Sequence, residues 1–351
     1  MFDFRALRFP LIQAPMAGGI NTPALAAAVC RAGAIGSFGF AYSTPERIAD
    51  DLAQTQALTS GPINANFFVF NPVEPPDLSA VDAALEAIRA LPIAAECPVA
   101  APRAPFFPAL EEQLAPVWQH RPAMLTFHFG TPPPGIIDRA HDLGMAVGIT
   151  ATCLEEAHSI EQAGADFIIA QGIEAGGHRG LFNPEAPDQK LACLPLAALL
   201  SHECSVPIVA AGGIMRGADI RAALSAGASA VQLGTAFLCC DESGASPEHK
   251  AFVLSKSERE SVFTRAFSGR PARGIDNAFI RRMEAKPVLP FPLQNTLTAP
   301  LRKLATQRGD GEYQSLWAGT AYRQAQSLPA QALISLLARE FEESSANPGR
   351  A

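Results

Sequence analysis

The sequence predicts an α/β protein in which eight parallel strands, each followed by a helix, close into a (β/α)8 or TIM barrel. Three observations predict it: short apolar runs alternate with helical patterns, the runs have the length of buried strands, and one helix–glycine–strand phrase recurs. Apolar runs of this kind suit strands that are buried on both faces of a parallel sheet. The eight runs are residues 11–17, 34–38, 63–69, 124–129, 146–150, 167–171, 207–211 and 230–233. An open, doubly wound sheet is the alternative arrangement.

The segments between the runs carry the start and stop signals of helices. Thr22 and Thr44 are N-cap candidates, and Pro45 stands at a first helical position, which proline tolerates well. Three predicted helices end at a glycine, the residue that most readily adopts a left-handed stop: residues 136–143, 154–163 and 218–226. Each of these glycines leads into the next apolar run, which supports repeated βα units.

Two regions depart from this alternation of predicted strands and helices. Residues 71–122 contain ten prolines, and only residues 81–91 look helical there, so we expect an elaborated and otherwise irregular connection after the third strand. Beyond the eighth strand no further strand pattern is visible, and segments such as residues 330–343 look helical and amphipathic. We therefore predict a cofactor-binding barrel over residues 1–241 and a mainly helical substrate or lid domain over residues 242–351, lying across the barrel mouth.

The composition excludes several classes of protein. With 48% apolar and 17% charged residues among 351, the chain is expected to be globular. A net charge of −7 argues against a nucleic-acid-binding protein, because such proteins depend on clustered cations. The two long uncharged stretches, residues 10–30 and 222–240, contain prolines or several polar residues, so we expect no membrane span. Seven cysteines without C-x-x-C spacing, and no signal-peptide pattern, indicate a cytoplasmic protein with reduced thiols; the oligomeric state is left open.

Glycines end the seventh and eighth predicted strands, where barrel enzymes often hold a phosphate group. Gly212 and Gly213 follow the seventh strand, and Gly234 and Thr235 follow the eighth. Glycine lets the backbone approach a ligand, and N–H groups at a helix start can hold an anion. Each turn alone is equally well explained by strand-to-helix geometry, but two in successive βα units predict a phosphate site. No dinucleotide G-x-G-x-x-G motif follows a strand.

Polar residues at three other strands are candidates for chemistry. Gln171 ends the sixth strand and can both donate and accept hydrogen bonds, and the glycine-rich loop after it contains His178, which can act as a base. Asn66 lies in the apolar third strand, and His128 ends the fourth. A structural hydrogen bond or packed side chain is the alternative for Asn66 and both histidines. The sequence has no close His, Cys and carboxylate cluster, so we predict no metal site.

These motifs resemble class I of the nitronate monooxygenase family, whose members were formerly called 2-nitropropane dioxygenases. The loop from Gln171 to His178 is the most specific match. The other matching segments are residues 13–19, 37–39, 64–67, 127–130, 211–214, 232–235, 293–295 and 315–319. The resemblance therefore runs through nearly the whole barrel and continues beyond it.

The resemblance implies a barrel that binds FMN without a covalent bond and oxidises alkyl nitronates, of the propionate 3-nitronate type, with O2. The nitronate gives an electron to the flavin, and the products are a carbonyl compound and nitrite. By position, the FMN contacts would be Met16, Asn66, Gln171, Gly176, Gly177, Gly212, Gly213, Gln232, Gly234 and Thr235. His178 would be the catalytic residue and His128 a substrate-binding residue. Class I members often have tyrosine where this chain has Phe291, which leaves the preferred substrate open.

Three other functions share part of this evidence. Related FMN enzymes that reduce quinones or enoyl thioesters with NAD(P)H have the same barrel and phosphate turns. A flavin-free barrel enzyme acting on sugar phosphates usually has a lysine on a strand, and none of the predicted strands contains one. A protein that keeps FMN without turnover would have the same pocket. Two imidazoles, at least one of them protonated, would favour a small anion over a neutral quinone, so we predict the monooxygenase.

Overall fold

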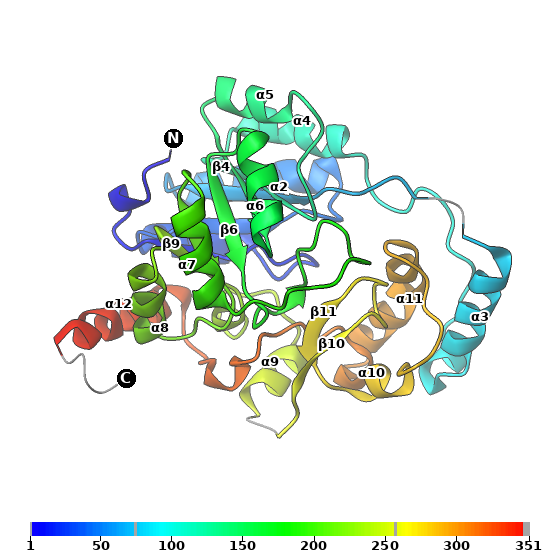
Figure 1. Ribbon diagram of the computed structural model, residues 1–351. Helices are drawn as coiled ribbons and strands as arrows, with labels where there is room; N and C mark the ends of the chain where they lie inside the picture. The colour runs from blue at the N-terminus through cyan, green and yellow to red at the C-terminus, as the bar shows by residue number, and fades with distance from the viewer. Residues whose placement is uncertain (1, 74–75, 256–257, 347–351) are drawn as a thin grey trace.

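Eight parallel strands form a closed barrel in the computed structural model, which describes residues 2–73, 76–255 and 258–346 (Figure 1). The strands are β1 (Leu11–Gln13), β2 (Gly36–Gly39), β3 (Ile63–Phe68), β4 (Met124–His128), β5 (Ala146–Ala151), β6 (Phe167–Gln171), β8 (Ile208–Ala211) and β9 (Ala230–Leu233). They lie in the order β1-β9-β8-β6-β5-β4-β3-β2. The ends of this order meet, because the N–H of Gln13 donates to the carbonyl of Ile35 and the N–H of Ile35 to that of Leu11, both at 2.9 Å. The predicted barrel is confirmed.

Helices surround the barrel, and several of them begin or end where the local sequence predicts. They are α1 (Pro23–Arg31), α2 (Pro45–Leu58), α4 (Leu110–His120), α5 (Ile136–Asp142), α6 (Leu154–Gln162), α7 (Cys193–Glu203), α8 (Gly217–Ser225) and α12 (Ala330–Ala346). The hydroxyls of Thr22 and Thr44 each accept a hydrogen bond from the N–H three residues further on, so both predicted N-caps are confirmed. Among the described helices, none combines the length and the apolar character needed to cross a bilayer.

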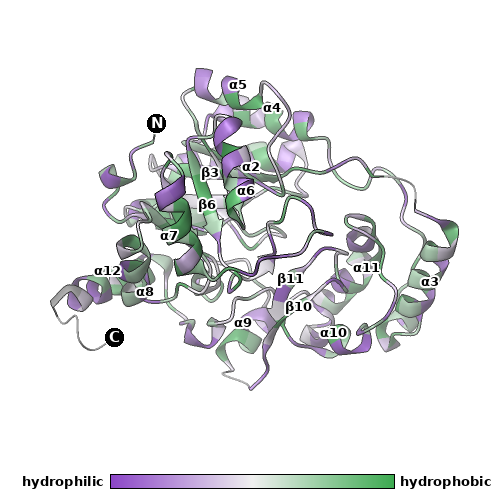
Figure 2. Cartoon of the chain, in the orientation of Figure 1, coloured by the Kyte–Doolittle hydropathy of each residue, from purple (hydrophilic) through white to green (hydrophobic). Residues whose placement is uncertain are grey.

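Apolar side chains close the end of the barrel where the strands begin. Ile12, Met124 and Phe167 are almost fully buried there. Phe4 covers this end, with its ring edge-on to that of Phe167 at 5.4 Å between centroids. Figure 2 shows the same division, with apolar strands inside and hydrophilic outward faces on helices such as α5 and α6. A ligand site must therefore lie at the opposite end, where the strands finish.

The proline-rich connection after β3 reaches a second hydrophobic core beside the barrel. Its helix α3 (Leu78–Arg89) and 3-10 helix η2 (Pro92–Glu96) lie beside α11 (Leu293–Gln307), which comes much later in the chain (Figure 1). Val81 of α3 and Phe267 belong to the same cluster of buried residues. The insertion and the C-terminal segment therefore stabilise one another.

The remainder of this connection is partly helical, so the expectation that it is irregular is wrong for α4. This helix packs on α2 as a member of the barrel's outer layer. It contains Pro116, which is buried in the helix interior. Proline usually breaks a helix, and together with the surrounding prolines it conceals the amphipathic pattern of α4 in the sequence.

The segment after β9 contains a small antiparallel sheet that the sequence pattern does not predict. β10 (Ser261–Thr264) and β11 (Ala272–Ile275) form a hairpin, and β11 also pairs with β7 (Gly177–His178). Both strands are four residues long; β10 is half-buried throughout and β11 is mostly buried, so neither shows the alternation of a typical strand. The pairing fixes the loop after β6, because His178 lies opposite Ala272. The other elements of this segment are α9 (Pro247–Leu254), α10 (Ala278–Arg282) and α11.

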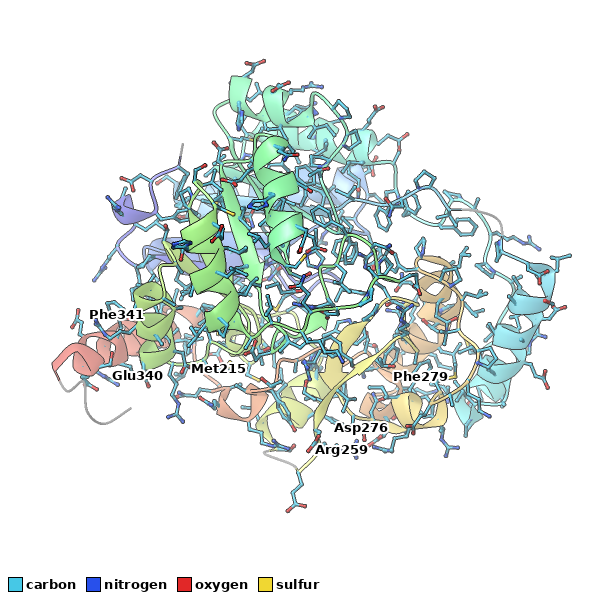
Figure 3. All side chains as sticks on the ribbon, viewed as in Figure 1. Met215, Arg259, Asp276, Phe279, Glu340 and Phe341 are labelled. Atoms are coloured by element: carbon cyan, nitrogen blue, oxygen red, sulfur yellow. The ribbon has the colours of Figure 1, made fainter. Side chains whose placement is uncertain are left out.

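Helix α12 packs on the outside of the barrel, so the expectation that residues 330–343 cover the mouth is wrong. It lies against α8 and α1, in the place of the helix that follows the last barrel strand (Figure 1). A carboxylate oxygen of Glu340 accepts a hydrogen bond from the N–H of Gly217 at 2.9 Å. The guanidinium of Arg221 lies 4.0 Å from the ring centroid of Phe341. Figure 3 labels Glu340 and Phe341 on α12, next to α8. The amphipathic face of α12 thus completes the outer layer of helices.

Candidate active site

A cavity of about 500 Å³ opens where the barrel strands finish. It extends from the strand ends to α11 and to the loop over residues 314–319. The residues proposed from the sequence all line its wall: Met16, Asn66, His128, Gln171, Gly176, Gly177, His178, Gly212, Gly213, Gln232, Gly234 and Thr235. This is the face at which barrel enzymes carry out their chemistry.

The turns after β8 and β9 form one side of the cavity, which we call the phosphate cradle: Gly212, Gly213, Gly234 and Thr235. Gly212 and Gly213 have φ values of 121° and 72°, in the region that favours glycine. A Cβ on Gly213 would lie 3.1 Å from the Cβ of Glu174, so a side chain here would crowd the turn. Helix α8 begins shortly after this turn, but its first N–H groups already donate to carboxylates: those of Met215 and Arg216 to Asp219, and that of Gly217 to Glu340. The glycines of the cradle are therefore what suits it to a phosphate, because they let the backbone approach a ligand closely.

Two amide side chains on the wall have hydrogen-bonding groups that suit a flavin ring. The Oε1 atom of Gln232 is buried and has no hydrogen-bond partner among the described residues. Leaving such a group unsatisfied costs about 1–3 kcal/mol, and a planar ligand with N–H donors and acceptors would satisfy it. The Nδ2 atom of Asn66 donates to the hydroxyl of Thr126 at 3.0 Å, which orients the amide at the end of β3. The residues present fit a flavin.

Gln171 holds the loop after β6 in place through both ends of its amide. Its Nε2 donates to the carbonyl of His178 at 2.9 Å, and its Oε1 accepts from the N–H of Gly180 at 2.8 Å. Arg179 is buried beside it, bonded to the carbonyl of Gln171 and paired with Asp188 at 2.9 Å. Gln171 therefore positions His178, and its predicted contact with FMN stays a prediction.

His178 is half-buried among aromatic side chains on the wall of the cavity. The ring centroids of Phe68, Phe129, Phe291 and Trp317 each lie 5.7 Å from that of His178. Burial, with the positive charges nearby, lowers the pKa of His178 to about 3. The imidazole is therefore neutral near pH 7.

His128 lies beside His178 and is neutral for the same reason. Its Nε2 donates to the carbonyl of His178 at 3.2 Å, which fixes this tautomer because a carbonyl only accepts. Burial, together with the charge of Arg270, lowers the pKa of His128 to about 3. The lowered pKa values of both imidazoles argue against the expectation that at least one of them is protonated near pH 7.

The hydrogen bond of His178 to Ser268 engages one of its two ring nitrogens. The Nε2 atom lies 2.9 Å from the Ser268 hydroxyl oxygen, which also lies 3.2 Å from the carbonyl of Arg270. With the hydroxyl hydrogen on that carbonyl, the serine oxygen accepts from Nε2–H and Nδ1 carries the free lone pair; with it on Nε2, the two ring nitrogens exchange roles.

Positive side chains that the sequence analysis missed lie on the α11 side of the cavity. Arg302 and Lys303 line it, and among the described residues no Asp or Glu does. Arg270 lies close by, with its guanidinium 3.7 Å from the ring centroid of Phe129. Nothing in the local sequence marks these arginines, since their place depends on how α11 and the loop between β10 and β11 pack against the barrel.

Among the described residues, the fold also brings together one group of metal-ligating residue types, and the prediction of no metal site stays a prediction. His158, Glu161 and Cys204 have ligand atoms within 4.8 Å of one another on the outer side of the barrel. Glu161 accepts hydrogen bonds from the N–H and the hydroxyl of Ser205 there. The group lies outside the cavity and contains none of the predicted site residues.

A (β/α)8 barrel with a phosphate cradle, amide groups for a planar ligand and a buried histidine at one mouth defines a cofactor-binding barrel enzyme. The chain belongs to the nitronate monooxygenase family, whose model matches residues 1–340. It is 41% identical over 345 residues to a nitronate monooxygenase of Paraburkholderia phytofirmans, covering 95% of this chain and 93% of that protein. It is 40% identical over 339 residues to one of Pseudomonas aeruginosa, covering 95% and 96%. Membership makes the chain a flavin-dependent oxidoreductase.

Solved structures agree with this assignment. A nitroalkane oxidase from Streptomyces ansochromogenes superposes with a TM-score of 0.90 at 38% identity, covering 98% of this chain and 99% of that one. FabK from Thermotoga maritima is more distant, with a TM-score of 0.74 at 26% identity over 99% and 96% of the two chains. The resemblance inferred from the sequence motifs is confirmed.

Proposed function

We propose that this protein is an FMN-dependent nitronate monooxygenase that oxidises alkyl nitronates with O2 to carbonyl compounds and nitrite. The observation that carries the proposal is the placement of His178 and the phosphate cradle in one cavity without acidic side chains among the described residues. A nitronate is an anion, and such a cavity favours anions. Propionate 3-nitronate is the type of substrate we expect.

The cradle and the amide side chains would hold the cofactor. The N–H groups of Gly212, Gly213, Gly234 and Thr235 would bind the FMN phosphate, and the Gln232 amide would bond the ring. Met16, Asn66, Gly176 and Gly177 line the space for the ring system. Bound FMN would supply an acceptor for the electron that the nitronate gives up.

His178 is proposed to take a proton from neutral nitroalkanes at its Nδ1 atom. The neutral imidazole needs no prior deprotonation, and Ser268 and Gln171 hold it in one orientation. A positioned base contributes about 10²–10⁴ in rate. A nitronate is already deprotonated and bypasses this step. His128 bonds the His178 carbonyl, and its contact with substrate stays a prediction.

The segment after β9 is proposed to form the substrate side of the cavity. Asn295, Ala299 and Arg302 of α11 line the wall opposite the strand ends. This supports the predicted substrate or lid role for residues 242–351, apart from α12. The seven cysteines are free in the structure, which supports the proposal of a reducing, cytoplasmic location.

An anaerobic spectrum of the purified protein tests the function. We expect a yellow protein whose released flavin is FMN, bleached by a nitronate and not by NADH, and which takes up O2 and forms nitrite in air. The alternative is a related NAD(P)H-dependent quinone or enoyl-thioester reductase. Rapid bleaching by NADH with negligible O2 uptake on nitronates would establish that alternative.

A further inference from the structure

Three side chains of metal-ligating types meet on the outer layer of helices, and the proposed function uses none of them. His158 and Glu161 lie on α6, three positions apart and therefore on one face of the helix, and Cys204 directly follows α7. One possible ligand atom of each lies within 4.8 Å of those of the other two. Imidazole nitrogen, carboxylate oxygen and thiolate sulfur are the donor types that zinc takes in proteins.

The spacing of these atoms is close to that of ligands around a bound ion. Ligands at the usual distances from a tetrahedral zinc lie roughly 3.3–3.8 Å from one another. The three side chains therefore need only small rotations to close around an ion. His158 is exposed, and Glu161 and Cys204 are half-buried. An ion can thus enter from solvent and keep a water molecule as its fourth ligand.

The carboxylate of Glu161 is already held in place for such a role. One of its oxygens accepts hydrogen bonds from the N–H of Ser205 at 2.6 Å and from the Ser205 hydroxyl at 2.8 Å. Burial acts to raise the pKa of Glu161, but its hydrogen bonds outweigh this effect, so the pKa is lowered and the group is ionised near pH 7. Hydrogen bonds of this kind orient the ligands of metal sites.

The electrostatics around the Cys204 thiol also favour a cation. Burial, with the negative charges of Glu161 and Glu203, raises the pKa of this thiol to about 11. A divalent cation reverses these effects, because a thiol that coordinates a metal releases its proton to solvent. The same cation would be attracted by both carboxylates. Charge and geometry therefore point to the same occupant.

This group lies at the end of the barrel away from the cavity. Glu161 precedes the start of β6 at Phe167, and Cys204 precedes the start of β8 at Ile208. In barrel enzymes, the end where the strands begin contributes to stability and not to chemistry. Helices α6 and α7 are neighbours in the outer layer (Figure 1). An ion bound by residues of both would link their C-terminal ends.

We propose that His158, Glu161 and Cys204 form a Zn²⁺ site, completed by water, that joins α6 to α7. The site is independent of the proposed nitronate oxidation. The sequence-based prediction of no metal site rests on ligand types close together in the chain, whereas Cys204 comes from a second helix. Zinc binding here would make that prediction wrong.

Calorimetric titration of Zn²⁺ into the holoenzyme, freed of metal with EDTA and kept reduced, tests the site. We expect one Zn²⁺ per chain with a Kd of about 0.1–10 µM, weaker than at a closed four-ligand site because water takes one position. His158→Ala and Cys204→Ser should each raise this Kd at least about tenfold, since losing a ligand costs no less than losing a group that orients one. Mg²⁺, which prefers oxygen ligands, should not compete.

Cys153→Ser is the matched control. Cys153 is also half-buried and lies beside a glutamate, Glu155, but at the opposite end of α6 and outside the metal-ligating group. Its substitution should change the Kd for Zn²⁺ by less than about twofold, because separate sites act independently.

Two further readouts use the unmodified protein, so they do not depend on whether a variant folds. Saturating Zn²⁺ should slow the alkylation of Cys204 by iodoacetamide at least about tenfold, because the metal engages the sulfur, and should leave Cys153 unaffected. Mass spectrometry of the two peptides measures both rates. The midpoint of thermal unfolding should rise by about 2–5 °C with Zn²⁺ at about 100 times its Kd, because the ion links two helices of the folded state.

The outcomes decide the proposal directly. Failure of the wild-type protein to bind Zn²⁺ would overturn it. An unchanged Kd in both His158→Ala and Cys204→Ser, or alkylation of Cys204 at the same rate with and without bound Zn²⁺, would show that the ion binds elsewhere and would also overturn it.

Discussion

Gly213 lies in the turn after β8, where we predict that the cofactor phosphate binds. Its φ of 72° favours glycine, and the cradle faces the start of α8. We expect Gly213→Asp to raise the Kd for FMN at least about 100-fold, because the new carboxylate places negative charge where the phosphate should bind. Flavin fluorescence titration of the apoprotein measures it.

The matched control for that substitution is Gly144→Asp. Gly144 has a similar φ of 78°, no atom within 4 Å of the place that a Cβ would take, and a position at the end of α5 away from the cavity. Both substitutions place aspartate at a similar positive φ, but Gly144→Asp leaves the cradle unchanged. An equal loss of FMN affinity in the two variants would show that the loss does not arise at the cradle.

His178 is expected to matter for proton transfer more than for stability. His178→Ala should lower kcat/KM for neutral nitroethane by about 10²–10⁴, because the base is lost. Ethyl nitronate has no proton to give up, so its turnover should fall by less than about tenfold. His202→Ala, an exposed substitution on α7, is the control. Normal turnover of both substrates by a flavin-loaded His178→Ala variant would mean that the histidine is structural.

For single residues, the sequence identifies those whose role depends on the residues next to them in the chain. Glycines at strand ends and a histidine in a glycine-rich loop can be recognised from local patterns, and all of them reach the cavity. Tyr42 and Arg302, which also line the cavity, cannot be recognised in this way. An arginine in an amphipathic helix, such as Arg302, usually faces water. The protonation of His128 and His178 also escapes the sequence, because it depends on burial from several elements.

Among the elements, the loop after β6 shows where local patterns stop being informative. A two-residue strand such as β7 has no pattern of its own, and it is ordered only because β11, far along the chain, pairs with it. The periodicity of α12 predicts a helix but does not predict its partner. The same amphipathic face would suit the barrel mouth or the groove between α1 and α8, and only the fold distinguishes them.

The contact between α8 and α12 gives a prediction of its own. A Cβ on Gly217 would lie 2.2 Å from the backbone nitrogen of Phe341 and 2.5 Å from the carbonyl oxygen of Leu337. Backbone atoms cannot move aside singly, so Gly217→Ala must displace α12. We expect the free energy of unfolding in urea to fall by about 1–3 kcal/mol, as for other overpacked sites.

Ser225→Ala on the same helix is the control, because Ser225 is exposed. It should change the free energy of unfolding by less than about 0.5 kcal/mol. FMN affinity should stay the same in both variants if α12 has only a structural role. Full stability of Gly217→Ala would show that α12 does not pack closely on α8 in solution.

The whole molecule combines a barrel that the sequence predicts with a second core, between the insertion and the C-terminal segment, that it does not predict. Eight buried strands separated by helices leave few alternatives to a closed barrel, so the period of the apolar residues is sufficient to predict it. The second core joins α3 to α10 and α11 across most of the chain length. No periodicity encodes such a contact, which explains why the sequence predicts the insertion and the C-terminal segment as separate features and not as partners.

Buried histidines should make the stability of the whole molecule depend on pH. His128 and His178 have pKa values lowered to about 3, and burial lowers that of His249 to about 4. In the unfolded chain each would have a pKa near 6.5, so the unfolded state binds more protons below that pH. Their contribution to stability is therefore complete above about pH 6.5 and is lost progressively as the pH falls toward 4.

This dependence can be measured between pH 7 and pH 5, above the range where most carboxylates titrate. Each histidine that stays neutral in the folded state should cost roughly 2 kcal/mol of unfolding free energy over that interval. His249→Gln removes one of them but keeps a donor for the Trp317 carbonyl, which His249 contacts at 3.1 Å. We expect the variant to lose stability less steeply with falling pH than the wild type. Parallel slopes in urea unfolding would mean that His249 is protonated in the folded protein, and that the cavity admits more water than its apolar walls suggest.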